Sequence, residues 1–225
     1  MIKRQLIGLS DQAHMTEAHE FGIHAVPDSY TMIGYTRLAN IELLINDVIE
    51  NKIDGHLIET GVWMGGACIY MKYLLNQHGS KKKVFVADSF KGLPEPDPKY
   101  THDEGDTHHQ VTFLRVSKER VQENFKAFGL LDKRVKFIEG WFKHTLPHLN
   151  ERFCIIRLDG DMYESTMDAL KNLYHKLNVG GYVIIDEYLL LHNCCAAVDA
   201  FRKANGITDE MIRIDKSGVY WKKTA

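Results

Sequence analysis

The sequence lacks the features that mark membrane, secreted and nucleic-acid-binding proteins. Its 28 lysines and arginines nearly balance 30 aspartates and glutamates, so the formal charge of −2 gives no electrostatic reason to expect nucleic acid or an anionic membrane. The apolar stretch near the N-terminus is too short for a signal peptide or a membrane span. The four cysteines form no CxxC pair, which favours small buried side chains in a reducing compartment. We therefore expect a cytoplasmic protein with neither nucleic acid nor membrane as partner.

Apolar runs that alternate with helical patterns are the main feature that is present. A length of 225 residues predicts a single domain over residues 1–225. Five short apolar runs predict strands at 56–60, 83–88, 134–139, 153–158 and 180–185, and the segments between and around them predict helices at 35–50, 67–76, 117–128, 164–177 and 193–205. Residues 211–214 and 219–221 predict a closing hairpin. This order indicates an α/β fold with a doubly wound, mostly parallel sheet and an antiparallel C-terminal hairpin strand.

Two segments fall outside this alternation. Residues 1–34 are mixed and polar, and we expect an N-terminal arm that packs on a partner or covers a site. Residues 97–116 follow a proline-rich stretch and predict a long loop, of the kind that acts as a lid. This loop contains His102, Asp103, Asp106, His108 and His109, but their loose spacing and the lack of a nearby cysteine favour a solvated lid that touches substrate over a zinc site.

Two predicted neighbouring strands end in pairs of acids. Asp159 and Asp161 follow the fourth strand, and Asp186 and Glu187 follow the fifth. Ligands of such sheets bind beyond the carboxyl ends of the strands, and adjacent strands lie about 4.8 Å apart. Carboxylates that close repel unless they share a proton or a cation, and Mg²⁺ suits oxygen ligands. The alternative is that Asp159 and Asp161 only cap the helix that begins near Glu164.

The turn after the first strand lacks both common glycine-rich phosphate-binding patterns. It has GxxxGG in place of GxGxxG, and no Gly-Lys-Ser/Thr follows, which excludes a P-loop. A carboxylate just before the glycines would repel a pyrophosphate but suit a cation that also carries an ammonium, as S-adenosylmethionine does. Asp88 ends the second strand, 23 residues after Gly65, where an acid can accept hydrogen bonds from ribose hydroxyls. The predicted cofactor corner comprises Glu59, Thr60, Gly61, Gly65 and Gly66.

Five motifs carry a resemblance to a known family. They are Leu57-Ile-Glu-Thr-Gly-Val-Trp-Met-Gly-Gly-Ala67, Val86-Ala-Asp-Ser-Phe-Lys-Gly-Leu-Pro94, Glu139-Gly-Trp-Phe142, Leu158-Asp-Gly-Asp-Met-Tyr-Glu-Ser-Thr166 and Gly218-Val-Tyr-Trp221. Residues 31–221 resemble the macrocin O-methyltransferase (TylF-like) family. The resemblance implies a Rossmann-like class I methyltransferase fold, use of S-adenosylmethionine and Mg²⁺, methylation of sugar hydroxyls in natural products, and a homodimer.

The resemblance also implies roles for individual residues. Asp161 would be the general base, and Asp159, Asp186 and Glu187 would hold the metal. The cofactor would contact Thr31, Met32, Glu59, Gly61, Asp88, Ser89, Gly140, Trp141, Phe142 and Asp159. The Thr31–Met32 segment would close over its methionine end, Glu59, Gly61, Asp88 and Ser89 would hold its tail and ribose, and the Gly140–Phe142 segment would border its adenine. One position departs from the family, which usually has Asp-Asp where this chain has Asp186-Glu187. Because Glu is one methylene longer, this position leaves open whether its carboxylate binds the metal directly or through water.

Three other functions remain open from the sequence. A catechol-like acceptor would chelate Mg²⁺ much as a sugar diol does. The Asp159-Gly-Asp161 sequence resembles the DxD of aspartate-nucleophile phosphatases, although that motif usually follows the first strand. A module that binds a nucleoside without catalysis would explain the cofactor corner but not the acids.

Overall fold

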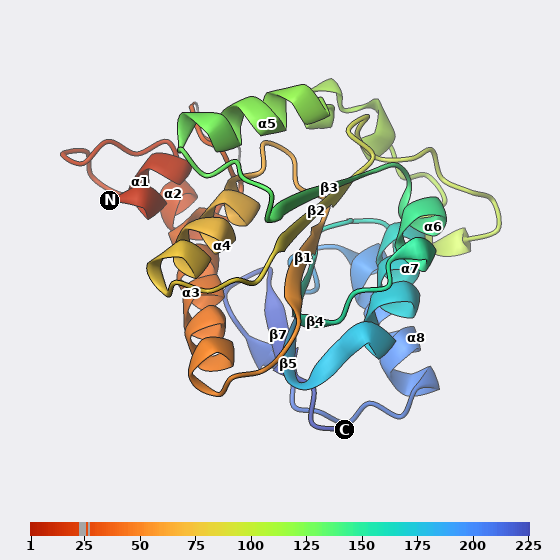
Figure 1. The fold of residues 1–225 in the computed structure, drawn as a ribbon. Helices are drawn as coiled ribbons and strands as arrows, with labels where there is room; N and C mark the ends of the chain where they lie inside the picture. The colour runs from red at the N-terminus through yellow and green to blue at the C-terminus, as the bar shows by residue number, and fades with distance from the viewer. Residues whose placement is uncertain (23–25, 27) are drawn as a thin grey trace.

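The computed structural model, which describes residues 1–22, 26 and 28–225, contains a seven-stranded sheet (Figure 1). The strands are β1 (His56–Thr60), β2 (Val84–Asp88), β3 (Val135–Glu139), β4 (Phe153–Leu158), β5 (Leu177–Ile185), β6 (Ile212–Arg213) and β7 (Val219–Lys222). Their order is β3-β2-β1-β4-β5-β7-β6, with β1 to β5 parallel and β7 antiparallel to both β5 and β6. The predicted doubly wound sheet with an antiparallel closing hairpin is confirmed.

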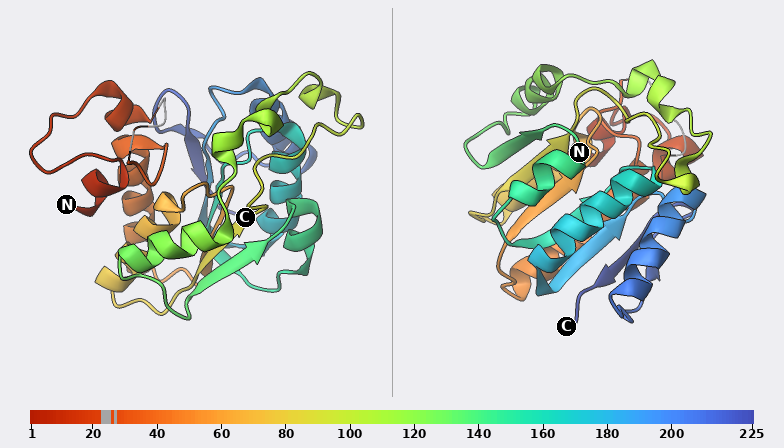
Figure 2. Two further views of the ribbon diagram at one scale, coloured as in Figure 1. Left: turned by 90° about the horizontal axis from the view of Figure 1, so that it is seen from above. Right: turned by 90° about the vertical axis from the view of Figure 1, so that its right-hand side faces the viewer.

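Helices cover both faces of this sheet. One face packs against α3 (Gly34–Glu50), α4 (Gly66–Gln77) and α5 (Lys118–Ala127), and the other against α6 (Phe142–Thr145), α7 (Tyr163–Leu173) and α8 (His192–Ala204). The right-hand view of Figure 2 shows α7 and α8 side by side over the second face. Alternate residues of each strand enter the two cores, as Leu57 and Ile58 do on β1. The central strands are thus buried on both faces, which is why they are apolar runs in the sequence.

The boundary between α7 and β5 was predicted wrongly. The helix ends at Leu173, a 3₁₀ turn covers Tyr174–Lys176, and β5 begins at Leu177 instead of Gly180. Leu177 is fully buried and pairs with Phe153 of β4. Pairing in the sheet therefore decides the conformation of a leucine whose sequence context suggested the end of a helix.

The N-terminal arm packs on the chain's own helices. It contains α1 (Ile2–Leu6) and α2 (Glu17–Phe21), and Leu6 is buried against the core. The amide of Tyr30 donates to the carbonyl of Leu6 at 2.7 Å, and the amide of Gly66 donates to the carbonyl of Tyr30 at 2.8 Å. Residues 23–25 and 27 of the predicted arm lie outside the described residues. Within the described chain, no helix is both long and apolar enough to span a bilayer.

Candidate active site

Two cavities open beyond the carboxyl ends of the parallel strands. Cavity 1 has a volume of about 340 Å³ and cavity 2 about 390 Å³. The residues that line both are Met32, Val62, Trp63, Asp159 and Asp161. The cavities therefore adjoin where β1 and β4 end, and a ligand in each would meet another at Asp159 and Asp161.

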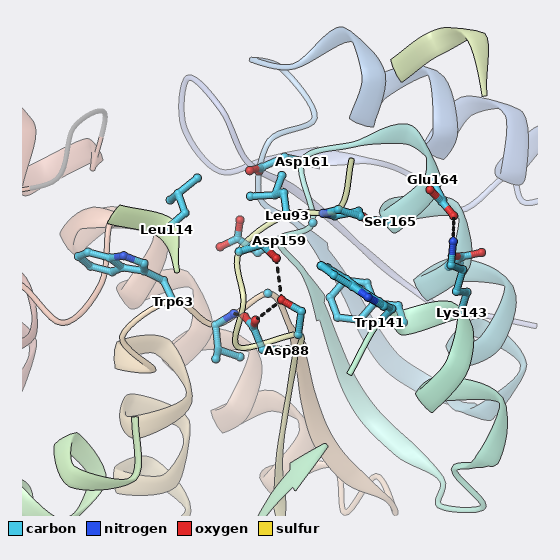
Figure 3. A pocket seen from close by; sticks show the side chains of 18 of the residues that line it. Trp63, Asp88, Leu93, Leu114, Trp141, Lys143, Asp159, Asp161, Glu164 and Ser165 are labelled. Carbon is cyan, nitrogen blue, oxygen red and sulfur yellow. Dashed lines mark hydrogen bonds and ion pairs between the residues drawn. The ribbon is translucent and has the colours of Figure 1, made fainter. Parts of the chain in front are cut away.

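Asp88 ends β2, as predicted, and lies on the wall of cavity 1 (Figure 3). Its carboxylate accepts hydrogen bonds from the amides of Val62 and Phe90, both at 2.7 Å. Burial raises the pKa of Asp88 against the lowering effect of these amides. A carboxylate has about four acceptor sites, so capacity remains for two ribose hydroxyls.

The other residues predicted around the nucleoside differ in what they contact. Trp141 and Phe142 line cavity 1 beside Leu93. Ser89 also lines the cavity, but its hydroxyl donates to the carbonyl of Gly92 at 2.6 Å and accepts from the amide of Lys91 at 2.9 Å, which stabilises the turn. Within the described structure, neither cavity is lined by Thr60, Gly65, Gly66 or Gly140.

The glycines of the first turn allow other backbone segments to approach closely. Gly61 lines cavity 1 with φ +80°, and a Cβ atom there would lie 1.7 Å from the carbonyl oxygen of Asp159. A Cβ atom on Gly66 would lie 2.3 Å from the carbonyl oxygen of Tyr30. Any side chain at either position would push away the acid-bearing loop or the arm, so these glycines position the cavity walls.

Cavity 2 contains the residues predicted for the methionine end of the cofactor. Thr31, Met32 and Glu59 line it together with the acids. Glu59 is buried and accepts hydrogen bonds from the thiol of Cys68, at 2.7 Å, and from the guanidinium of Arg157. Burial raises the pKa of Glu59 against the opposing effect of Arg157.

The four predicted acids do converge, but two buried arginines accompany them. Arg157, on β4, contacts Glu59, Asp186 and Asp159, the last at 2.9 Å. The sequence analysis missed it, although one basic residue within an apolar strand run is a signal for a buried ion pair.

Arg37 of α3 is the second arginine that the sequence analysis missed. It contacts Asp186, and its nitrogens lie 3.5 Å from Glu187 and 3.1 Å from Asp215. The same guanidinium donates to the carbonyl of Phe21 at 2.9 Å, at the end of α2. Arg37 therefore joins the N-terminal arm to the acid cluster, and no local sequence pattern marks it.

A divalent cation fits the remaining carboxylates. One oxygen each from Asp159, Asp161 and Glu187 lie within 4.8 Å of one another, while the two oxygens of Asp186 face Arg37 and Arg157. Burial and the neighbouring Asp186 raise the pKa of Asp159 well above its usual value and that of Glu187 to about 9. The crowding of these carboxylates therefore disfavours their charged forms unless a cation joins them, and hard oxygen ligands of this kind suit Mg²⁺.

Helix capping does not account for Asp159 and Asp161. The amides of Tyr163 and Glu164 at the start of α7 donate to the carboxylate of Asp103, at 2.7 and 2.9 Å. Asp103 is fully buried, so the prediction of a solvated lid is wrong at this position. The loop supplies the cap from a distant part of the chain, which leaves Asp161 facing the cavities.

Three residues with left-handed backbones lie at the strand ends. They are Trp63, Phe90 and Asp161, with φ values of +47°, +55° and +58°. Such conformations are costly for residues other than glycine and tend to occur at ligand sites. Each of the three follows a strand whose end borders the cavities.

Comparisons with known proteins agree with this geometry. The family model of the macrocin-O-methyltransferases (TylF) matches residues 3–223. The chain is 45% identical over 218 residues to a demethyldecarbamoylnovobiocin O-methyltransferase of Streptomyces niveus, covering 95% of this chain and 83% of that one. It is 40% identical over 223 residues to a mycinamicin III 3''-O-methyltransferase of Micromonospora griseorubida, covering 96% and 87% of the two chains.

The solved structure of the O-methyltransferase NovP superposes with a TM-score of 0.95 at 42% identity, over 100% of this chain and 97% of that chain. The DxD sequence follows the fourth strand in chain order and not the first, so the phosphatase interpretation fails on position as well as on family. The non-catalytic interpretation fails because the relatives are named O-methyltransferases. The chain belongs to the macrocin-O-methyltransferase family and is an O-methyltransferase.

Proposed function

We propose that the protein transfers the methyl group of S-adenosylmethionine to a sugar hydroxyl of a glycosylated natural product and requires Mg²⁺. The observation that carries this proposal is the junction of the two cavities at Asp159 and Asp161. Cavity 1 has an acid for ribose hydroxyls and aromatic walls for a base, and cavity 2 has the acid cluster. A methyl donor whose nucleoside lies in the first cavity and whose methionine end reaches Thr31, Met32 and Glu59 in the second would present its methyl group at this junction, beside the acids where an acceptor would bind.

The metal would be held by carboxylates that the structure brings together. Asp159 and Glu187 contribute oxygens to the group within 4.8 Å. The resemblance adds Asp186, whose two oxygens face Arg37 and Arg157 in this structure. Bound there, Mg²⁺ would acidify and orient a hydroxyl of a vicinal diol. Asp161 lines both cavities and would accept the hydroxyl proton as the oxygen bonds to the methyl carbon and the carbon–sulfur bond breaks.

An apolar rim supports a glycoside as acceptor. Phe113 and Leu190 line cavity 2, and they stay 56% and 60% exposed. Large apolar side chains at the edge of a charged cavity suit a ligand with a polar sugar beside an apolar aglycone. The name of one relative, which is 45% identical over 201 residues, states a rhamnosylated tetracenomycin as its acceptor, and such an acceptor is of this class.

Calorimetry tests the proposal in two steps. S-adenosylmethionine is titrated into metal-stripped protein, and Mg²⁺ and a panel of glycosides, free sugars and catechols follow. We expect cofactor binding without metal, and acceptor binding only after Mg²⁺, with glycosides preferred to free sugars. Absence of cofactor binding with and without Mg²⁺ would refute the proposal, and a preference for catechols would replace the acceptor class.

A matched variant separates binding from catalysis. Asp161→Asn keeps the size of the side chain but cannot accept a proton as a carboxylate does, so it should bind the cofactor and fail to methylate. Full turnover by this variant would remove Asp161 from the mechanism.

The proposed assembly is a homodimer, as the resemblance implies. Light scattering on the purified protein tests it, and a mass near the 25.9 kDa of one chain would contradict it.

A further inference from the structure

Cavity 1 continues past the indole of Trp141 to an ion pair that the proposed function does not use. Lys143 of α6 and Glu164 of α7 line this end, and the ammonium of Lys143 donates to Glu164 Oε1 at 2.9 Å. In the view of Figure 3, Trp141 lies between Asp88 and this pair. A nucleoside whose ribose contacts Asp88 would extend its base along Trp141 toward Glu164.

Glu164 has one oxygen that the fold leaves unused. Its side chain is 6% exposed, yet Oε2 has no hydrogen-bond partner in the described part of the chain. A buried acceptor without a partner costs about 1–3 kcal/mol, so native proteins usually provide one. Glu164 is one of the residues that line cavity 1, so a ligand in that cavity is a candidate donor once Oε2 turns toward it.

Neighbouring groups hold the side chain of Glu164 in place. The amides of Tyr163 and Glu164 are capped by Asp103, so the Glu164 side chain is not needed as the cap of α7. The hydrogen bond with Glu164 raises the pKa of Lys143, which keeps the ammonium charged beside the carboxylate. The side chain of Lys143 is 43% exposed, whereas that of Glu164 is buried, so Glu164 is the more firmly held member of the pair.

We propose that Glu164 selects an adenine base by accepting a hydrogen bond from its 6-amino group. This inference rests on the proposed use of S-adenosylmethionine and identifies the residue that recognises its adenine base. A carboxylate can only accept, so it suits a 6-amino group and repels the 6-oxo group of hypoxanthine or guanine. Lys143 acts as a positioning residue, because its effect on the base passes through Glu164.

The test compares two ligands on two proteins by calorimetry. The ligands are S-adenosylhomocysteine and its 6-oxo analogue, S-inosylhomocysteine. Wild type should bind the amino ligand at least tenfold more tightly, since a hydrogen bond to a charged group contributes about 1.5–3 kcal/mol. Glu164→Gln can donate as well as accept, so its preference should fall to within about threefold, with weaker binding of the amino ligand and tighter binding of the oxo ligand.

The matched control is a second glutamate–lysine pair that lies elsewhere in the structure. Glu139 also pairs with a lysine, Lys118, at 2.5 Å, and lies outside both cavities. Glu139→Gln should leave the ratio of the two affinities as in wild type. The N6,N6-dimethyl analogue of S-adenosylhomocysteine gives a test that needs no variant, because it cannot donate, and wild type should bind it at least tenfold more weakly.

The outcomes separate the two proposals. Tight binding of S-adenosylhomocysteine by wild type, with equal preference in wild type and Glu164→Gln, would overturn the role of Glu164 and leave the proposed function intact. Equal binding of the dimethyl analogue would overturn it even if the variant did not fold. If wild type bound neither nucleoside, the proposed cofactor and this inference would both fail.

Discussion

Replacement of Asp103 tests whether the loop of residues 97–116 is fastened to the fold by one carboxylate. Asp103 is fully buried and accepts from the amides of Tyr163 and Glu164 at 2.7 and 2.9 Å. Asp103→Ala would leave both donors without a protein partner. Lost helix caps cost about 0.5–2 kcal/mol, and a buried donor without a partner costs about 1–3 kcal/mol.

We therefore expect Asp103→Ala to lower the free energy of unfolding by about 2–4 kcal/mol. For a domain of this size each kcal/mol corresponds to roughly 2–4 °C in Tm, which gives a fall of roughly 5–15 °C. Asp103→Asn keeps one acceptor oxygen, so its loss should be about half as large. Urea unfolding measures the free energy, and hydrogen exchange should show faster exchange across residues 97–116, because Asp103 ties this loop to α7.

Asp97 provides the control in the same loop. Its carboxylate accepts from the amide of Lys99 at 2.9 Å, within an exposed turn. Asp97→Ala should change the free energy of unfolding by no more than about 0.5 kcal/mol. If Asp103→Ala were as stable as Asp97→Ala, the loop would be fastened by other contacts and the reasoning would be refuted.

Three further predictions concern the site itself. Asp88→Asn removes the carboxylate expected to accept from ribose and should weaken S-adenosylmethionine binding roughly tenfold in calorimetry; unchanged affinity would place the ribose elsewhere. Arg157→Met leaves the buried Glu59 without a facing cation and Asp186 with Arg37 alone, and it should cost about 3–5 kcal/mol in urea unfolding, partly restored in Arg157→Lys. A loss under about 1 kcal/mol would mean that Glu59 is protonated in the fold. Mg²⁺ at 100 times its Kd should stabilise the protein by about 2.7 kcal/mol and raise Tm, and Asp159→Asn should reduce this effect; equal stabilisation of both would place the ion elsewhere.

The sequence by itself determined the alternation of strands and helices and the acids at the strand ends. Strands such as β1 and β2 are read correctly because a central parallel strand must be apolar on both faces, which is a local property. The position of Asp159 and Asp186 at strand ends is also a local property, and the two residues converge because Leu158 pairs with Ile185 in the sheet. Asp88 likewise lines cavity 1 because it ends a parallel strand at the same edge of the sheet.

Only the tertiary structure decided which charges accompany those acids. The sheet register places Glu59 beside Arg157, and that register depends on β1 and β4 being neighbours although they lie far apart in the sequence. Arg37 reaches Asp186 from a helix 149 residues earlier. Ion pairs between distant segments have no sequence period, because a carboxylate can pair with a basic side chain that approaches it from any direction. For that reason the sequence predicted a negative cluster, and the fold decided how much of its charge is already balanced.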